Sequence, residues 1–232
     1  MTVPIIGYIL WESSTVVSIA TLESTNDKTG NMIQIWFLLK NHHPLDAVKS
    51  GLDAKTICRG CVFASGNGCY VNVGQAPAQI WRTYHRGRYG KLDPVDYASV
   101  FGGRRVRFGA YGNPSILPIS IIKAIAEASD GWTGYFHDWA EMTPQTARMD
   151  GQYFMASTDT DDSRCEAEAK GLRYFHVSDT QPVGTRECLA DTKGLECRAC
   201  LLCQGNTKAK QLPIWINPHG STKTRAILAS QG

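Results

Sequence analysis

The feature that most constrains the fold is an alternation of strand-like and helix-like segments, which begins near residue 77. The helix-like stretch "PAQIWRTYHRGRYG" precedes the strand-like "RRVRFGAYGNP", and the helix-like "ISIIKAIAEASDG" precedes "TGYFHDW". The pattern continues through "QYFMASTD", "DDSRCEAEAKG", "LRYFHVSD" and "QLPIWINPHG". Strands and helices that alternate at this spacing are typical of a parallel βα array, in a barrel or an open sheet.

The first fifty residues follow a different pattern. The runs "IIGYILW", "VVSIATLE" and "MIQIWFLLK" are separated by short polar turns, which favours an antiparallel meander. A chain of 232 residues with 43% hydrophobic residues can form one domain with a sizeable core. We therefore expect one α/β domain: a β-rich part over 1–50, a βα core over 51–187 and a cysteine-rich segment over 188–220.

Polar residues follow several of the expected strands. In a βα array the carboxyl ends of the strands meet on one face, where active sites lie, so this pattern favours an enzyme. The alternative is that each aspartate only caps the next helix, which is the role we assign to Asp161 and Asp162. The residues at strand ends are Asn113, His137, Asp138, Asp159, Asp179 and His219.

The segment "ECRACLLCQG" predicts a metal site near the end of the chain. Cys197, Cys200 and Cys203 have the spacing that lets a turn bring thiolates onto one ion, and zinc then needs a fourth ligand. Cys188 and His219 are both candidates for that ligand. Because a catalytic zinc keeps an open position, four protein ligands indicate a structural zinc.

A second group, Cys58, Cys61 and Cys69, predicts a possible second metal site. The metal is either a zinc that His85 or Cys165 completes, or an iron–sulfur cluster with an open iron. The alternative without a metal is that small thiols pack under a glycine-rich loop. The chain carries no recognisable secretory signal and no apolar run long enough for a bilayer, so we expect a cytoplasmic protein with reduced thiols.

A net charge of +3 is mild, so an argument for nucleic-acid binding depends on local clusters. "WRTYHRGRYG" interleaves aromatic residues with Arg82, Arg86 and Arg88, which suits phosphate binding and base stacking. Lys28 in "STNDKTGN" lies in a second candidate phosphate loop. The alternative is a solvated basic helix whose aromatic side chains belong to the core.

A resemblance to a known family covers about residues 16–220. The motifs that carry it are "STNDKTGNMIQIW", "CYVNVGQAP", "WRTYHRGRYG", "VRFGAYGNP", "TGYFHDW" and "MASTD", together with the cysteine-rich segment. The chain resembles phage-encoded members of the tRNA-guanine transglycosylase superfamily, in the branch that places 7-deazaguanine bases in DNA. The resemblance implies a (βα) barrel, a zinc held by three cysteines and a histidine, and two catalytic aspartates. Because this chain is much shorter than the tRNA enzymes, we expect a minimal or incomplete barrel.

The resemblance also implies a base-exchange reaction with DNA and a free 7-deazaguanine base as substrates. A carboxylate attacks the sugar and expels guanine, and a second acidic group handles the proton. We assign the attack to Asp159, with Asp179 in reserve, and acid–base or recognition roles to Asp138 and His137. The amides of Asn72, Gln75 and Asn113 are candidates for reading a purine edge.

Two other functions remain open from the sequence. The first is an iron–sulfur or radical-type nucleotide-modifying enzyme that uses Cys58, Cys61 and Cys69. The second is a zinc-stabilised DNA-binding protein without catalysis.

Overall fold

A computed structural model describes residues 6–206 and 211–218 of the chain; His219 therefore lies outside the described residues. These residues form a mixed α/β fold around one sheet of ten strands. The strands are β1 (Gly7–Glu12), β2 (Val16–Thr21), β3 (Ile33–Leu39), β4 (Gly90–Lys91), β5 (Val106–Tyr111), β6 (Trp132–Phe136), β7 (Met155–Thr158), β8 (Tyr174–Val177), β9 (Arg186–Glu187) and β10 (Ile214–Ile216).

The strand order across the sheet is β4-β1-β2-β3-β5-β6-β7-β8-β10-β9. The pairs β1–β2 and β2–β3 are antiparallel, which confirms the expected N-terminal meander. From β3 onward every pair is parallel, as the strand–helix alternation predicts. The last strand within the described residues, β10, lies between β8 and β9.

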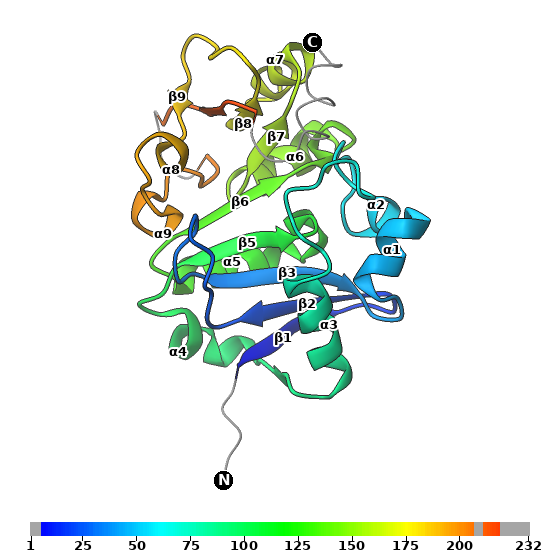
Figure 1. Cartoon of the computed structure of the whole chain (residues 1–232). Helices are drawn as coiled ribbons and strands as arrows, with labels where there is room; N and C mark the ends of the chain where they lie inside the picture. The colour runs from blue at the N-terminus through cyan, green and yellow to red at the C-terminus, as the bar shows by residue number, and fades with distance from the viewer. Residues whose placement is uncertain (1–5, 207–210, 219–232) are drawn as a thin grey trace.

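The helices connect and cover these strands (Figure 1). They are α1 (Pro44–Ser50), α2 (Leu52–Thr56), α3 (Ala76–His85), α4 (Tyr97–Phe101), α5 (Ile119–Ala128), α6 (Pro144–Gly151), α7 (Asp161–Ala169), α8 (Leu189–Thr192) and α9 (Cys197–Cys200). Three 3-10 turns are η1 (Pro94–Asp96), η2 (Pro114–Ile116) and η3 (Asp138–Ala140). Residues 44–50 are thus helical, so the β-rich N-terminal part ends earlier than the sequence pattern indicates.

The parallel part of the sheet has two distinct faces, because side chains alternate along each strand. The helix face carries Phe108, Phe136 and Ala156, which pack with buried residues of α5, α6 and α7. The loop face carries Arg107, Tyr135, Met155, Phe175 and Ile214 of β5, β6, β7, β8 and β10. Irregular, cysteine-containing segments pack on this loop face.

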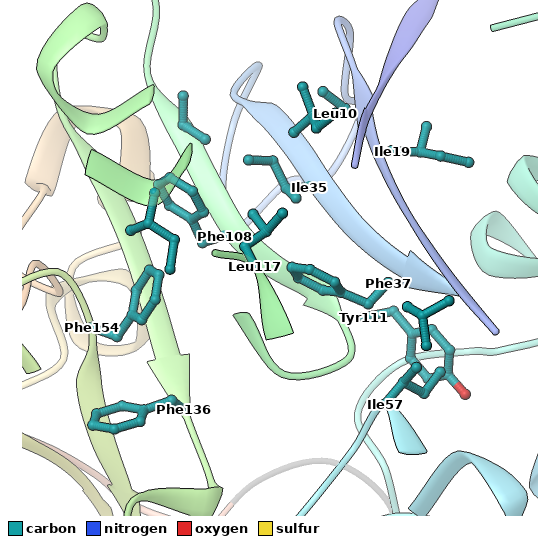
Figure 2. Close-up of a cluster of buried hydrophobic side chains, with 14 of the residues drawn as sticks. Leu10, Ile19, Ile35, Phe37, Ile57, Phe108, Tyr111, Leu117, Phe136 and Phe154 are labelled. Carbon is teal, nitrogen blue, oxygen red and sulfur yellow. The ribbon is translucent and has the colours of Figure 1, made fainter. Parts of the chain in front are cut away.

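Large aromatic side chains form part of the hydrophobic core on the helix face. Figure 2 shows Phe108, Phe136 and Phe154 together, and the ring centroids of Phe108 and Phe154 lie 5.3 Å apart. All three side chains are fully buried, and burial of such a side chain stabilises a fold by about 1.5–3 kcal/mol. None of the helices in the described part of the chain has the length and apolar character needed to cross a bilayer.

Candidate functional site

The carboxyl ends of β6 and β7 bring together three of the predicted catalytic residues, His137, Asp138 and Asp159. His137 directly follows β6, and Asp159 directly follows β7. By alternation both side chains belong to the loop face, one position beyond the strands. Burial lowers the pKa of His137 to about 4, although the negative charges of Asp159 and Asp138 act in the opposite direction. The imidazole is therefore neutral at pH 7 and lies within electrostatic reach of two carboxyl groups.

Asp138 is buried and oriented by a hydroxyl group. Its side chain is only 5% exposed, and Ser115 Oγ lies 2.9 and 2.8 Å from the two carboxylate oxygens. Ser115 is part of η2, which directly follows the neighbouring strand β5. The ends of two adjacent strands thus fix the position of this carboxylate.

Asp159 has a different environment. Its side chain is half-buried, and burial raises its pKa, while His137 acts to lower it. The next residue, Thr160, caps α7 by accepting a hydrogen bond from Ser163 N at 3.1 Å. Thr160 provides the cap, so Asp159 is not needed for it. Asp161 and Asp162, which we expected to cap this helix, lie in its first turn instead.

A loop of residues 57–70 crosses over these strand ends. A Cβ added at Gly60 would lie 2.5 Å from the His137 carbonyl oxygen, so the backbone of the loop directly contacts the end of β6. Farther along, Phe63 packs with Val177 and Ile216 at the ends of β8 and β10. Burial raises the pKa of Cys61 to about 11, and the Asp159 charge contributes in the same direction. The loop therefore covers the site from β6 to β10.

The loop is held by Asp53, a residue that the sequence analysis did not single out. Asp53 lies on α2, is 2% exposed, and accepts hydrogen bonds from Ser65 N at 3.2 Å and Ser65 Oγ at 2.7 Å. The Tyr111 hydroxyl lies 3.5 Å from the same carboxylate. In the sequence, Asp53 is only a charged residue five positions before Cys58, and this spacing does not indicate a specific role.

Cys58, Cys61 and Cys69 are part of this loop and lie near one another. Burial raises the pKa of Cys58 well above its usual value, and the charges of Cys61, Asp53 and Cys69 add to that effect. The two proposed completing ligands are placed elsewhere. His85 Nε2 lies 2.8 Å from the Lys40 carbonyl oxygen, and Cys165 is exposed on α7.

Cys197, Cys200 and Cys203 of the second cysteine group lie toward the opposite, amino-terminal ends of the strands, whereas Cys188 directly follows β9 at its carboxyl end. Cys197 N donates to the Lys28 carbonyl at 2.9 Å, in the loop before β3, and Gly134 N donates to the Cys203 carbonyl at 3.2 Å. Burial raises the pKa of Cys203 to about 12; among other contributions, the charges of Cys188 and Cys197 also raise it. Cys188 packs against the same cluster of side chains as Cys203, and also against the cluster of Phe63, Val177 and Ile216 that Cys61 and Cys69 contact.

The four thiols lie within electrostatic reach of one another: burial raises the pKa of Cys197, and the charges of Cys188 and Cys200 raise it further. Among residues 6–206 and 211–218, no group of three or more His, Cys, Asp or Glu side chains is arranged to hold a metal ion. The predicted ligand His219 lies outside these ranges. Both metal sites stay predictions.

The predicted substrate-binding residues fall into two classes. Asn113 follows β5 next to Ser115, is fully buried, and has no hydrogen-bond partner for either atom of its side-chain amide within the described chain. Asn72 and Gln75 are exposed on the segment before α3, where Gln75 occupies the N-cap position. Asp179, the reserve nucleophile, is exposed beyond the end of β8.

The predicted nucleic-acid-binding residues are exposed but belong to different parts of the surface. Lys28 lies in the β2–β3 loop beside α9, whereas Arg82, Arg86 and Arg88 lie on α3 or directly after it. Figure 1 shows α9 and α3 on different sides of the molecule. The neighbouring aromatic side chains contact the protein itself: Trp81 Nε1 donates to the Leu39 carbonyl at 2.9 Å, and the Tyr84 hydroxyl donates to Glu12 at 2.7 Å.

Comparison with known proteins adds no assignment, because no family model, no curated protein and no solved structure matches this chain. The residues at the carboxyl ends of β5, β6 and β7 are therefore the basis for a proposal of function.

Proposed function

We propose that this protein is a base-exchange enzyme that replaces guanine in DNA with a 7-deazaguanine derivative. The observation that carries the proposal is the pair of carboxyl groups, Asp138 and Asp159, around the neutral imidazole of His137 at two adjacent strand ends. Glycosidic bond exchange needs one carboxylate to attack and one acidic group to move a proton. The parallel strands would then form an incomplete (βα) barrel, whose carboxyl-terminal face is the usual place for such a site.

In the proposed reaction an Asp159 oxygen forms a bond to the anomeric carbon while the bond from that carbon to guanine N9 breaks. The bonding electron pair leaves with guanine, which takes a proton from Asp138. The incoming 7-deazaguanine returns a proton to Asp138, and its ring nitrogen displaces the Asp159 ester. We assign the attack to Asp159 because it is half-buried, whereas Asp138 is 5% exposed and held by Ser115.

Zinc at the second cysteine group would contribute to the structure and would take no part in this reaction. Thiolates are suitable zinc ligands, and Cys188, Cys197, Cys200 and Cys203 supply four of them. Base exchange on phage DNA would occur in the cytoplasm of the bacterial host.

The test incubates the purified protein with duplex DNA and labelled 7-deazaguanine base, and then measures label in the digested nucleosides. We expect incorporation by the wild type and a loss of about 10³-fold or more in Asp159→Asn and in Asp138→Asn. Asp162→Asn, at an exposed position on α7, is the matched control and should keep full activity. Absence of label in the wild-type product, with and without added zinc, would refute the proposal.

The position of Cys61 within electrostatic reach of Asp159, with Cys58 and Cys69 near it, favours an iron–sulfur enzyme as a second candidate. Anaerobic purification with iron and sulfide distinguishes the two candidates. Visible absorption that disappears in Cys61→Ser, without base exchange, would support the second candidate over the first.

A further inference from the structure

Arg107 is a positively charged side chain on the loop face, close to the candidate site. It is the second residue of β5, and its register partner on β6 is Thr133. The guanidinium carbon lies 4.4 Å from the centroid of the Tyr135 ring, so the cation stacks on the aromatic face. The side chain is half-buried.

Arg107 differs from Arg104, Arg164 and Arg198 because no carboxylate among the described residues forms an ion pair with it. Arg104, Arg164 and Arg198 each form an ion pair with a glutamate or aspartate. Arg107 forms no ion pair with any residue in the described ranges. A partly buried cation without a counter-charge is unfavourable unless hydrogen bonds or a ligand satisfy it. The neighbours of Arg107 in the described part of the chain include Tyr135 and the thiols of Cys197 and Cys203.

Arg107 lies between the two ends of the loop face, with His137 on one side and two cysteines on the other. Burial is the largest influence on the pKa of His137, followed by the charges of Asp159 and Asp138. The positive charge of Arg107 is a smaller influence and lowers this pKa. On the other side, Arg107 lies within electrostatic reach of Cys197 and Cys203. Along β6, Tyr135 and His137 are alternate residues on one face and so lie about 7 Å apart. This separation is close to the length of one sugar–phosphate unit.

We infer that Arg107, stacked on Tyr135, binds a phosphate of the nucleotide whose sugar is attacked at Asp159. The inference rests on the proposed function, because it assumes a nucleotide at the end of β6 and β7. A guanidinium group offers two parallel N–H donors to phosphate oxygens, and a Tyr135 ring below it would keep that group from turning away. The site would therefore select nucleotides over nucleosides.

A different role for the same cation would be to balance the charge of a metal bound to the thiolates of Cys197 and Cys203. That role predicts that loss of Arg107 changes the metal content of the protein. It predicts no difference between a nucleotide and the corresponding nucleoside.

The experiment measures binding of 2′-deoxyguanosine 5′-monophosphate and of deoxyguanosine by calorimetry, to the wild type, Arg107→Met and Arg105→Met. Arg105 is an exposed arginine next to β5 and is the matched control. We expect the wild type to bind the monophosphate more tightly than the nucleoside. Arg107→Met should lose about 10- to 100-fold in affinity for the monophosphate alone, and Arg105→Met should bind as the wild type does.

Two results would overturn the inference: equal affinity of the wild type for the two compounds, or unchanged monophosphate binding by Arg107→Met. Circular dichroism, unfolding by urea and zinc content are measured on each variant. A loss of zinc in Arg107→Met with unchanged preference for the monophosphate would assign the cation to the cysteines instead. If the wild type shows the expected preference but no label enters DNA, the phosphate site stands and the base-exchange proposal fails.

Discussion

The two ends of the parallel strands differ in the kind of buried polar groups that they carry. At the carboxyl ends, the Asn113 amide lacks a described partner, His137 is neutral, and burial raises the pKa of Asp159. At the amino-terminal ends, Arg173 donates to the carbonyl oxygens of residues 202, 204, 205 and 212. Hydrogen bonds to buried groups stabilise a fold, and of the Arg173 guanidinium only Nε lacks a partner within the described residues. Under the proposed function, the carboxyl ends provide the chemistry, and the Arg173 contacts at the amino-terminal ends stabilise the fold.

The largest expected effect on stability is at the amino-terminal end. Arg173→Met removes the donor for four backbone carbonyls around the cysteine-rich segment, and we expect a loss of about 3 kcal/mol or more in the free energy of unfolding. Urea unfolding measures this change. Arg186→Met, at an exposed position in β9, is the control and should change the midpoint little. Equal stability of the two variants would contradict the comparison.

The next effect concerns pH and involves His176, which lies on the helix face and is 1% exposed. Burial lowers its pKa to about 4, so between about pH 6.5 and pH 4 the unfolded chain binds a proton that the folded chain does not. Stability is therefore complete above pH 6.5 and decreases as the pH falls, by about 2 kcal/mol at pH 5 for this group. His137 should add a similar decrease.

The measurement compares urea unfolding at pH 7 and pH 5 in the wild type, His176→Gln and His42→Gln. His176→Gln should show a smaller decrease between the two pH values. His42 is exposed, and its variant should keep the wild-type decrease. An identical decrease in all three proteins would show that burial of His176 is not the cause.

Asp150 should act in the opposite direction. It is 7% exposed, and burial, together with the charge of Asp138, raises its pKa to about 7. The folded chain keeps a proton there that the unfolded chain loses near pH 4, so this group decreases stability as the pH rises toward 7. We expect Asp150→Asn to be more stable than the wild type at pH 8 by about 1–2 kcal/mol, and equally stable at pH 4. Unfolding curves at the two pH values provide the test.

The smallest expected effect on stability is at the carboxyl end. Ser115→Ala removes the hydroxyl that bridges both oxygens of Asp138, and we expect a loss of only about 1 kcal/mol in stability. Base exchange should decrease by about 10-fold or more, because Asp138 loses its orientation. Ser115→Thr keeps a hydroxyl and should recover part of the activity. A large loss of stability without a change in activity would reverse the roles of the two ends.

Much of the secondary structure follows from the sequence. The apolar periods in "ISIIKAIAEASDG" and "QYFMASTD" predict α5 and β7, and the alternation between them predicts parallel pairing. Strand ends also pointed to His137, Asp138 and Asp159, because parallel pairing places such ends side by side. These predictions succeed where local pattern and chain order determine the outcome.

Other features depend on contacts between residues far apart in the chain, which no local pattern contains. Asp53 supports the loop through Ser65, and Arg173 holds carbonyls about thirty residues away. In the sequence Arg107 is only one of three arginines in "RRVRFGAYGNP", and its pairing beside Thr133 in the sheet is what places it on the loop face. The sequence also does not show that the side chains of Trp81 and Tyr84 form hydrogen bonds within the protein, or that Asn113 is fully buried.

The position of β10 has a consequence for the order in which the chain acquires its structure during synthesis. Within the described sheet, β9 pairs only with β10, although it precedes β10 by more than twenty residues. Until residues 214–216 have left the ribosome, β9 has no neighbour, and Cys188 directly after it has no fixed position. The strands β5 to β8 can pair as they emerge, whereas β9, with Cys188 directly after it, can pair only after β10 has been synthesised. We therefore expect chains that stop before residue 214 to keep the β1–β8 core and to expose the second cysteine group to solvent and oxidation.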